Sequence, residues 1–431
     1  MKNYRVLVLA EAANPDWTSV PLLGWFHTAA LKKVCSVHLA TQIRNRSAIL
    51  NAGWKEGEDF SAIDSESIMR PLHNFASFLR GGDQVGWTIS TALQSIGYLY
   101  FEYLVWHQFK KRLENGEFDI VHRITPVSPT APSWIAKKLK KIGVPFVVGP
   151  LNGGVPWPKQ FRSAQHQEKE WLSYIRDFYK LLPGYSATRR DSSAIIVGSK
   201  ATYEQMADFA KGKCVFLPEN GVNEQRFSLK RSGAYGLPLK ATFVGRLVPY
   251  KGADMAIEAM RELVEAGVLE YHIYGDGPER ARLQEMIDKY GLRDKVVLHG
   301  FVKNENLQHE LSKCDLLVFP SIREFGGGAV LEAMALGIVP VVVDYGGPAD
   351  LVSDAEGYLI PLGERAQIVA SLRATLSAIC SSPEILSRKS ALCVDKINNS
   401  LTWDAKVKQV IDIYDWISEG GEKPAALDPA A

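Results

Sequence analysis

Residues 315–337 read Asp315-Leu-Leu-Val-Phe-Pro-Ser-Ile-Arg-Glu-Phe-Gly-Gly-Gly-Ala-Val-Leu-Glu-Ala-Met-Ala-Leu-Gly337. The apolar run at 315–320 predicts a short buried strand. The glycines predict a loop, and the good helix formers that follow predict a helix, which Gly337 caps at its C-terminus. A strand that leads through a glycine-rich loop into a helix is the repeating unit of a parallel α/β sheet. This stretch therefore decides the fold class of the second half of the chain.

The same alternation continues on both sides of that stretch. Strands are predicted at 241–245, 269–274, 295–299 and 338–343. The helices between them are predicted at 254–265, 279–290 and 304–313. Right-handed crossovers place the loops that follow the strands on one edge of the sheet, where ligands bind. We therefore expect a doubly wound parallel sheet with a ligand site at this edge.

The first half of the chain alternates less regularly. Strands are predicted at 4–10, 35–41, 118–123, 144–149 and 193–198. Helical stretches are predicted at 91–114 and 131–141, together with a charged helical insertion at 160–190. At 431 residues the chain exceeds the size at which a single hydrophobic core stops growing. The simplest architecture is α/β, with two Rossmann-like, doubly wound domains that face a cleft.

The composition argues against several classes of protein. A net charge of +2 gives no sign of a nucleic-acid-binding surface. The five cysteines are scattered without a CxxC spacing, which predicts buried reduced thiols rather than a disulfide frame. No apolar run reaches the roughly 18 residues of a membrane span, and the run Arg5-Val-Leu-Val-Leu-Ala10 is too short for a signal peptide. We therefore expect a cytoplasmic protein.

Two acidic residues accompany the glycine-rich loop. Glu324 lies in the loop before the predicted helix, and Glu332 lies about one turn inside it. The helix N-terminus offers N–H groups and a partial positive charge to an anion. Carboxylates accept hydrogen bonds from hydroxyls. A ligand that carries both an anionic phosphate and several hydroxyls suits this arrangement, so the sequence predicts a nucleotide-sugar site.

Two basic residues follow the first strand of the same sheet. Arg246 and Lys251 come after the strand at 241–245 and precede a helix. Arginine can bind a diphosphate in a bidentate manner, and lysine acts as a point charge. Either cation alone would suggest a solvated surface residue. Because this strand end shares an edge with the glycine-rich loop, we expect the two cations and the helix N-terminus to hold a diphosphate together.

Six short motifs now stand in a fixed order along the chain. They are Pro218-Glu-Asn-Gly221, Gly245-Arg246, Lys251-Gly252, Gly275-Asp-Gly-Pro278, Gly300-Phe-Val302 and the pair Glu324-x7-Glu332. Each motif is weak alone, but the ordered set resembles glycosyltransferase family 4, a large retaining family with the GT-B fold. The resemblance covers most of residues 190–350 and only spots of the N-terminal half, where such enzymes bind different acceptors.

The resemblance implies a role for each matching residue in the second half. Arg246 and Lys251 would hold the donor diphosphate and stabilise the leaving group. Glu324 would bind hydroxyls of the donor sugar, and Glu332 would bind the ribose hydroxyls. The remaining donor-binding positions implied by the resemblance are Phe325, Gly326, Gly327 and Gly328 beside the sugar and phosphates, and Gly300, Phe301 and Val302 beside the base.

Two positions in the first half are also implied. His122, near the end of the strand at 118–123, matches the family's histidine close to the donor sugar. By itself a histidine there would more often be structural. Gly24 stands where the family often has a Gly-Gly pair near the phosphates, but here it is followed by Trp25. Trp25 would either pack or shape the acceptor side. The implied catalytic set is His122, Arg246, Lys251 and Glu324.

The reaction implied is transfer of a sugar from a nucleoside-diphosphate sugar to a hydroxyl of a glycan, lipid-linked or small-molecule acceptor, with retention. The leaving phosphate would help to deprotonate the acceptor, so no metal and no cofactor beyond the co-substrate is expected. Glu324 as a covalent nucleophile is the less favoured mechanism. The other candidate functions are a hydrolysing nucleotide-sugar epimerase and a non-catalytic nucleotide-sugar-binding subunit of a larger synthase.

The polar, turn-rich residues 223–238 form the best linker between domains. Residues 402–417 place apolar side chains on one helical face. Members of the family often run such a final helix back onto the first domain, and the same is expected here. The predicted divisions are 1–222 on the acceptor side, the linker 223–238, the nucleotide-sugar domain 239–400, the returning helix 401–420 and a tail, 421–431, that is expected to be disordered.

Residues 67–112 mix aromatic side chains with arginines and lysines. Aromatic residues next to cations suit a membrane interface, which leaves open a peripheral contact with the inner face of a membrane. A helix that packs on the sheet and ends in charged residues is at least as good an interpretation. The predicted partners are therefore a nucleotide-sugar donor and a hydroxyl acceptor, with no nucleic acid.

Overall fold

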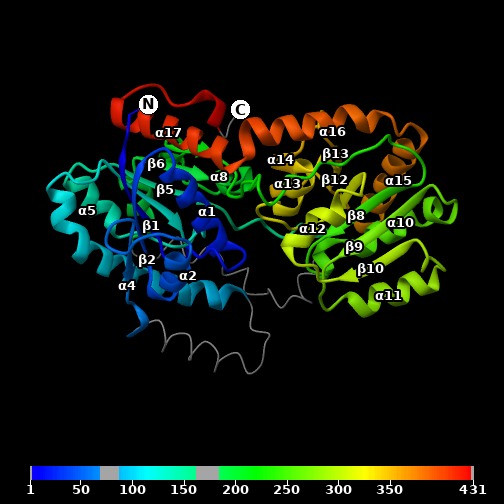
Figure 1. The fold of residues 1–431 in the computed structure, drawn as a ribbon, viewed down its shortest axis with the longest axis horizontal. Helices are drawn as coiled ribbons and strands as arrows, with labels where there is room; N and C mark the ends of the chain where they lie inside the picture. The colour runs from blue at the N-terminus through cyan, green and yellow to red at the C-terminus, as the bar shows by residue number, and fades with distance from the viewer. Residues whose placement is uncertain (1, 68–86, 162–183, 429–431) are drawn as a thin grey trace. The chain divides into compact units, whose positions relative to one another are not determined.

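The computed structural model describes residues 2–67, 87–161 and 184–428, and it contains two parallel β-sheets with helices on their faces (Figure 1). The chain divides into two compact units. Unit 1 takes in the described parts of Met1–Gly154, Gln165–Glu219 and Lys406–Ala431. Unit 2 takes in Val155–Ala164 and Asn220–Ala405. The predicted first domain, 1–222, is therefore not continuous, because the segment that starts at Val155 belongs to unit 2.

Unit 1 is built on a seven-stranded sheet in the order β3-β2-β1-β4-β5-β6-β7. Its strands are β1 (Arg5–Ala10), β2 (Ser36–Gln42), β3 (Phe60–Ile63), β4 (Ile120–Thr125), β5 (Phe146–Leu151), β6 (Ala194–Val197) and β7 (Cys214–Phe216). The central strands β1 and β4 are almost entirely buried, as expected for parallel strands that are covered on both faces. The short strand β3 was not predicted, because four residues give little periodic signal.

The helices of unit 1 connect these strands and cover the sheet. They are α1 (Val20–Lys32), η1 (Ile43–Asn45), α2 (Arg46–Asn51), α4 (Trp87–Glu114), α5 (Ile135–Lys141), α7 (Tyr185–Asp191), α8 (Lys200–Glu204), α9 (Asp208–Lys211), α17 (Trp403–Glu419) and η6 (Ala425–Leu427). Most of the insertion predicted at 160–190 lies outside the described residues. The tail was expected to be disordered, but it forms η6 and buries Leu427.

Helix α4 carries most of the aromatic residues that raised the possibility of a membrane contact. Tyr98, Phe101 and Phe109 are completely buried in the core of unit 1. Between them the buried Glu102 accepts a hydrogen bond from the Ile135 backbone N–H at 3.0 Å, which caps helix α5. These three aromatic residues therefore belong to the core, whereas Tyr103 on the same helix is 49% exposed. Residues 68–86 of the same segment lie outside the described residues.

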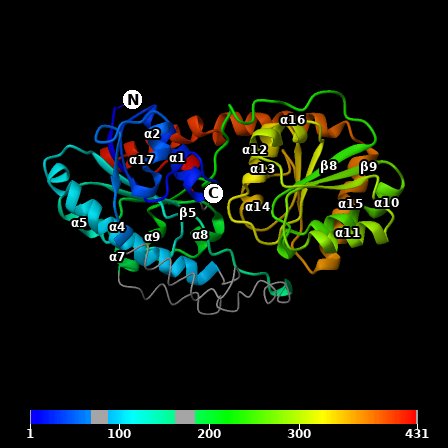
Figure 2. The same ribbon diagram turned by 60° about the horizontal axis from the view of Figure 1, so that its bottom comes forward.

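The helix expected over 402–417 is α17, and it packs on unit 1. Tyr414 is fully buried, and the Tyr4 hydroxyl donates a hydrogen bond to Asp415 Oδ1 at 2.6 Å. The Tyr4 and Tyr414 rings meet edge to face at 5.7 Å. Both ribbon views place α17 beside the strands of unit 1 (Figures 1 and 2). The last helix therefore completes the core that the first strand begins.

Unit 2 is built on a six-stranded sheet in the order β10-β9-β8-β11-β12-β13. Its strands are β8 (Leu239–Val244), β9 (Leu269–Tyr274), β10 (Val296–Gly300), β11 (Leu316–Phe319), β12 (Val339–Val343) and β13 (Tyr358–Ile360). Every pair is parallel. The strand order turns at β8 and β11, so the loops that follow these two strands meet at the switch point of the sheet.

Helices cover both faces of the second sheet. They are η2 (Lys159–Phe161), η4 (Pro249–Lys251), α10 (Ala253–Glu265), α11 (Arg280–Lys289), α12 (Asn304–Leu311), α13 (Gly328–Ala335), α14 (Gly347–Leu351), α15 (Arg365–Ser381), α16 (Ile385–Lys396) and η5 (Ile397–Leu401). Figure 2 shows α10 and α15 on one side of the strands and α13 and α16 on the other. The doubly wound α/β fold class predicted for both halves is confirmed.

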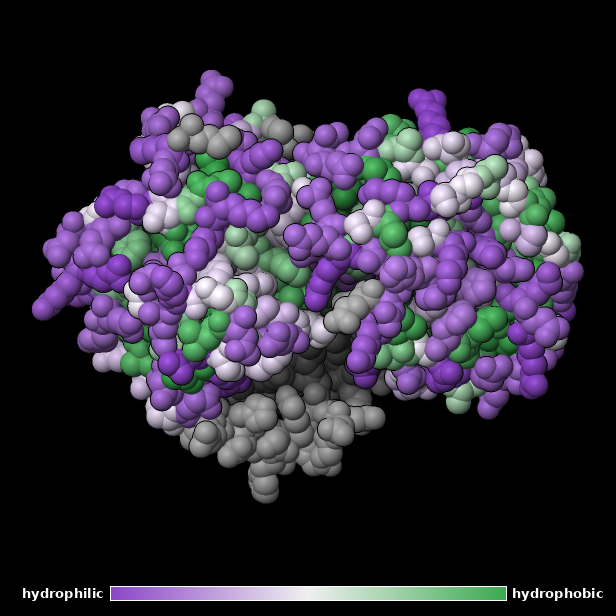
Figure 3. Space-filling model, viewed as in Figure 1, coloured by the Kyte–Doolittle hydropathy of each residue, from purple (hydrophilic) through white to green (hydrophobic). Residues whose placement is uncertain are grey.

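The surface shows few large apolar areas on the face drawn in Figure 3, where hydrophilic residues surround smaller hydrophobic groups on both units. Among the residues that the structure describes, none of the helices has both the length and the apolar character needed to cross a membrane. All five cysteines are buried and free, as predicted from their spacing.

Candidate active site

The loop that follows β8 carries both predicted cations. Arg246 is exposed, and Lys251 ends the short helix η4. Gly252 has a left-handed backbone, with φ 75°, and is the N-cap residue of α10. A Cβ atom at Gly252 would lie 2.4 Å from the Pro320 carbonyl oxygen. Glycine is therefore required here, because this loop lies directly against the chain that leaves β11.

Hydrogen bonds hold the loops after β8 and β11 together. The Ile322 backbone N–H donates to the Tyr250 carbonyl oxygen at 3.0 Å. The Ser321 hydroxyl donates to the same oxygen at 3.3 Å. The residues next to these contacts are Lys251 on one loop and Glu324 on the other. The two loops therefore form one surface that fixes both side chains.

Lys251 and Glu324 form an ion pair on this surface. The Lys251 Nζ contacts Glu324 Oε2, and the two side chains are only 15% and 19% exposed. Burial lowers the pKa of Lys251 to about 8. The Glu324 carbonyl oxygen accepts a hydrogen bond from Gly347 N–H at 3.0 Å. The arrangement places a cation for a phosphate directly beside an acceptor for hydroxyls.

The glycines after Glu324 shape the start of helix α13. Gly327 has φ 58° and is the N-cap residue of the helix, to which it contributes no capping side chain. A Cβ atom at Gly327 would lie 2.7 Å from Leu351 Cδ1. Gly326 is buried, and its carbonyl oxygen accepts a hydrogen bond from Asn220 Nδ2 at 3.3 Å. The first N–H groups of α13 therefore have no side-chain cap and suit an anion.

Glu332 lies on helix α13, one turn after Gly328. Its side chain is half-buried, and this burial raises the pKa of the carboxyl group to about 7, although the charge of Arg226 acts in the opposite direction. Near neutral pH the group therefore exists in both protonation states. Its ionised form can accept hydrogen bonds from a diol such as ribose.

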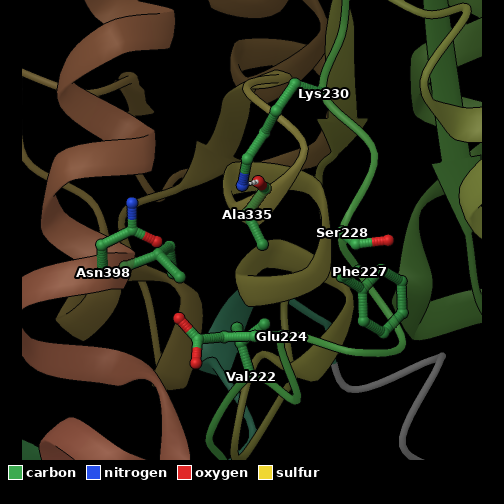
Figure 4. A pocket seen from close by; sticks show the side chains of 8 residues that line it. Val222, Glu224, Phe227, Ser228, Lys230, Ala335 and Asn398 are labelled. Carbon is green, nitrogen blue, oxygen red and sulfur yellow. Dashed lines mark hydrogen bonds between the residues drawn. The ribbon is translucent and has the colours of Figure 1, made fainter.

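The opposite end of α13 is closed by a basic side chain. Lys230 Nζ donates to the carbonyl oxygen of Ala335, the last residue of the helix, at 2.6 Å (Figure 4). A cation at the C-terminus stabilises a helix through its dipole. Val222, Phe227 and Asn398 line a cavity of about 230 Å³ around this contact. The cavity lies at the C-terminal end of α13 and contains none of the predicted site residues.

The predicted base-binding residues follow β10 on the same edge of the sheet. Gly300 has φ 76°, and its carbonyl oxygen accepts a hydrogen bond from Gly275 N–H at 2.8 Å. Phe301 is 76% exposed, which is unusual for a phenyl ring. Val302 is half-buried and packs against the core of unit 2. An exposed ring beside a fixed glycine can stack on a planar ligand.

His122 does not lie at an accessible surface. It is completely buried in the middle of β4. Its Nδ1 is 2.7 Å from the Tyr414 hydroxyl, and its Nε2 is 2.8 Å from the Gly149 carbonyl oxygen. Burial lowers the pKa of His122 to about 4. Since both ring nitrogens are used inside the core, the structure favours a structural role for His122, and its contact with the donor stays a prediction.

Gly24 is also a packing residue. It lies inside helix α1, and a Cβ atom there would be 2.2 Å from the Ala12 carbonyl oxygen. Glycine is needed because the helix lies directly against the loop that follows β1. Trp25 is 8% exposed, and its ring packs 5.0 Å from the ring of Trp54. The donor contact at Gly24 stays a prediction, and of the two interpretations of Trp25 the structure favours packing.

A segment from the first half of the chain also reaches this site, which the sequence patterns did not predict. Trp157 stands between two prolines in the segment Val155–Ala164, which belongs to unit 2. Its ring meets the Tyr250 ring edge to face at 5.8 Å, and the Arg323 guanidinium lies over it at 4.8 Å. The only available signal was the Pro-Trp-Pro sequence itself. Trp157 thus contacts the neighbours of both Lys251 and Glu324.

Within the described residues, no group of three or more histidine, cysteine, aspartate or glutamate side chains is placed to hold a metal ion. The charged groups at this edge of unit 2 include Arg246, Lys251, Arg323, Glu324 and Glu332. Such a set can bind an anion and several hydroxyls.

This same region of the chain is similar to a known protein family. Residues 224–386 match the family model described as Glycosyl transferases group 1. The match contains the strands β8 to β13 and the loops that carry Lys251 and Glu324. The site residues described in unit 2 therefore lie in the part of the chain that is similar to this family model.

Curated relatives are similar over the same part of the chain. The amylovoran biosynthesis glycosyltransferase AmsK of Erwinia amylovora is 34% identical over 165 residues, which are 36% of this chain and 40% of that protein. The 2-deoxystreptamine glucosyltransferase of Streptomyces kanamyceticus is 32% identical over 155 residues, which are 36% of this chain and 39% of that protein. The chain thus spans about 40% of the length of the curated relatives it matches.

Solved structures are similar over nearly the whole chain. A glycosyltransferase from Rickettsia africae ESF-5 aligns with a TM-score of 0.62 and 14% identity, over 98% of this chain and 100% of that one. Anabaena HepE in complex with UDP aligns with a TM-score of 0.60 and 14% identity, over 94% and 99% of the two chains. At this identity the likeness concerns the fold alone, and it confirms the predicted pair of Rossmann-like units of the GT-B type.

Proposed function

We propose that the protein is a retaining glycosyltransferase that moves a sugar from a nucleoside-diphosphate sugar to a hydroxyl group. The observation that carries this proposal is the Lys251–Glu324 ion pair beside the N-terminus of α13, which stands inside the part of the chain that matches Glycosyl transferases group 1. A cation, an acceptor for hydroxyls and a helix N-terminus on one surface match the three chemical parts of such a donor.

The chain's own residues supply electrostatic assistance to the departure of the diphosphate. Arg246 and Lys251 would offset the charge that develops on the leaving oxygen, and stabilisation of this kind commonly lowers the barrier more than any other single effect. Glu324 would accept hydrogen bonds from the donor sugar. Because its carboxylate already contacts Lys251, it suits binding better than covalent attack. Glu332 would accept hydrogen bonds from the ribose.

Retention follows, in this proposal, from attack on the same face from which the diphosphate departs. The acceptor hydroxyl would lose its proton to an oxygen of the leaving phosphate. Its oxygen would bond to the anomeric carbon as the carbon–oxygen bond to the diphosphate breaks. The products are the glycosylated acceptor and the nucleoside diphosphate. None of these steps requires a nucleophile from the protein.

The nucleotide and the acceptor are matters for experiment. HepE was solved with UDP, so UDP and its sugar derivatives are the first donors to test. The relatives' names mention a polysaccharide, amylovoran, and a small molecule, 2-deoxystreptamine. We therefore propose an acceptor hydroxyl on a glycan, on a lipid-linked glycan or on a small molecule.

A thermal-shift screen of UDP, GDP, ADP and their common sugar derivatives tests the proposal. At least one nucleotide should raise the melting temperature by binding the folded state. With the matching donor, release of nucleoside diphosphate should require an acceptor and should yield an α-configured product from an α-linked donor. Release without an acceptor, with an epimerised sugar, would identify a hydrolysing epimerase. Binding without turnover on any acceptor would identify a non-catalytic subunit.

Metal independence is a separate part of the proposal. Two cations and a helix N-terminus can neutralise a diphosphate without Mg²⁺. Transfer should therefore continue in excess EDTA at close to its original rate. Complete loss of transfer in EDTA, with recovery on addition of a divalent cation, would contradict this part of the proposal.

A lipid-linked acceptor would also bring the protein to a membrane surface. Among residues 97–112, the Phe, Trp and Tyr side chains that remain accessible are Tyr103, at 49% exposure, and the half-buried Tyr100, whose rings stack at 6.2 Å. We propose that any peripheral contact through α4 uses this face. Flotation with anionic vesicles tests it, and Tyr103→Ser should reduce the bound fraction. Equal flotation of the variant would exclude α4 from the contact.

A further inference from the structure

Unit 2 contains a segment that comes from the first half of the sequence. This segment, Val155–Ala164, follows β5 of unit 1 and is described up to Phe161. Phe161 is buried in the core of unit 2, and the Tyr345 hydroxyl donates to the Pro156 carbonyl oxygen at 2.8 Å. Val155 is completely buried as well. The segment is therefore anchored on unit 2 at both of its described ends, independently of the side chain between them.

Trp157 lies between these anchors and packs on residues of the candidate site. The Arg323 guanidinium lies over two rings, 4.8 Å from the centroid of Trp157 and 5.3 Å from that of Phe325. The indole also meets the Tyr250 ring at 5.8 Å, almost perpendicular to it. A guanidinium over aromatic faces is attracted by the quadrupoles of the rings, more strongly when it is partly desolvated. The stack therefore restricts the position of Arg323.

The neighbours of Trp157 are adjacent in sequence to the two members of the ion pair. Arg323 precedes Glu324, and Tyr250 precedes Lys251. The indole ring thus contacts both the loop after β8 and the loop after β11. Hydrogen bonds to the Tyr250 carbonyl oxygen also join these two loops. Trp157 is half-buried and makes these contacts with its side chain alone. Its removal would loosen the stack and leave Phe161 and Pro156 in place.

We propose that Trp157 is a positioning residue for the donor sugar. Through its stack with Arg323 it holds Glu324 in the geometry that the transition state requires. This inference rests on the proposed function, and it adds that the donor site is completed by a segment from the first half of the chain. The diphosphate is held by groups that Trp157 does not touch, so its binding depends less on this residue than turnover does.

The experiment compares turnover with nucleotide binding in the full-length chain. For Trp157→Ala we expect kcat to fall about tenfold, because small misplacements of reacting groups slow a reaction steeply. The Kd for UDP, by calorimetry, should change less than about twofold. Trp157→Phe keeps an aromatic face and should restore most of the lost kcat. Phe209→Ala, a change at a residue that is 54% exposed on α9, is the matched surface control and should leave both values unchanged.

Arg323 gives a second variant that does not depend on the folding of the first. Arg323→Lys keeps the charge but loses the planar group that stacks on the rings, and it should lower kcat as Trp157→Ala does. The double variant should cost no more than either single change, because both remove the same stack. Additive losses, an unchanged kcat in Trp157→Ala, or a UDP affinity that falls as far as kcat would each overturn the inference. A wild-type protein that binds no nucleotide would instead overturn the proposed function itself.

Discussion

His122 in unit 1 and Lys251 in unit 2 were predicted to serve the same donor, but their surroundings differ in kind. His122 lies within β4, is completely buried and uses both ring nitrogens on Tyr414 and Gly149. Lys251 lies beyond the end of β8, keeps 15% of its side chain exposed and contacts one carboxylate. A residue inside a central strand serves the core, whereas a residue in the loop after the strand can meet a ligand. The difference favours the edge of unit 2 over β4 as the place of the proposed donor site.

The largest loss of turnover is expected when the acidic member of the ion pair is changed. Glu324→Gln keeps the shape of the side chain but loses its charge, and we expect turnover to fall on the order of 100-fold. The melting temperature should change little, because the residue lies in a half-buried loop. Glu262→Gln on the exposed face of α10 is the control. Near-normal turnover in folded Glu324→Gln would remove the residue from the site.

UDP binding should depend on pH on both the acid and the alkaline side of neutrality. The lowered pKa of Lys251, about 8, means that its cation is lost as the pH rises through 8. The raised pKa of Glu332, about 7, means that its carboxylate is lost as the pH falls through 7. UDP affinity should therefore be greatest between these values. Above pH 8 it should fall by up to about tenfold for each pH unit, and on the acid side by a few-fold, because a protonated carboxyl can still form hydrogen bonds.

Two variants show which residue is responsible for each limb of the pH profile. Lys251→Arg keeps a charge at all accessible pH values and should flatten the alkaline limb. Glu332→Gln should flatten the acid limb. Calorimetric Kd values between pH 6 and 9.5 provide the measurement. A profile whose limbs persist in both variants would show that other groups control binding.

The smallest effect on turnover is expected at His122. His122→Phe leaves the Tyr414 hydroxyl and the Gly149 carbonyl oxygen without their partner in the core, which should cost about 1–3 kcal/mol of unfolding free energy. Turnover of the folded fraction should stay within about twofold of the wild type. Denaturation curves and assays on the same samples separate the two effects. A loss of turnover comparable to that of Glu324→Gln, in a variant of normal stability, would return His122 to the active site.

The βα units of unit 2 were predictable because their signals are local. Apolar runs, helix formers and glycines alternate within short windows, and they placed the loops of Lys251 and Glu324 correctly at one edge of the sheet. The burial of His122 was not predictable in this way, because it depends on Tyr414, which is 292 residues away along the chain. The strand also continues to Thr125, two residues beyond its predicted end, so that His122 lies deeper than expected.

The segment around Trp157 was missed for a related reason. Pro156-Trp157-Pro158 follows β5 and has no periodicity from which a packing partner could be inferred. Its place in unit 2 depends on contacts with Tyr250, Arg323 and Tyr345, all of which are far away in the sequence. Gly24 shows the same limit, since its proximity to the Ala12 backbone exists only after α1 has packed. Residues whose role depends on distant partners need the structure.

The central claim is that the loops after β8 and β11 of unit 2 bind the donor diphosphate. Calorimetric titration of UDP into the full-length wild type and into Lys251→Ala tests it most directly, with Lys240→Ala, at the other end of the same strand, as the matched control. We expect one UDP site in the wild type, an unchanged site in Lys240→Ala, and a roughly 10- to 100-fold weaker site in Lys251→Ala, as for the loss of a hydrogen bond to a charged group. Equal UDP affinity in the wild type and Lys251→Ala would contradict the account.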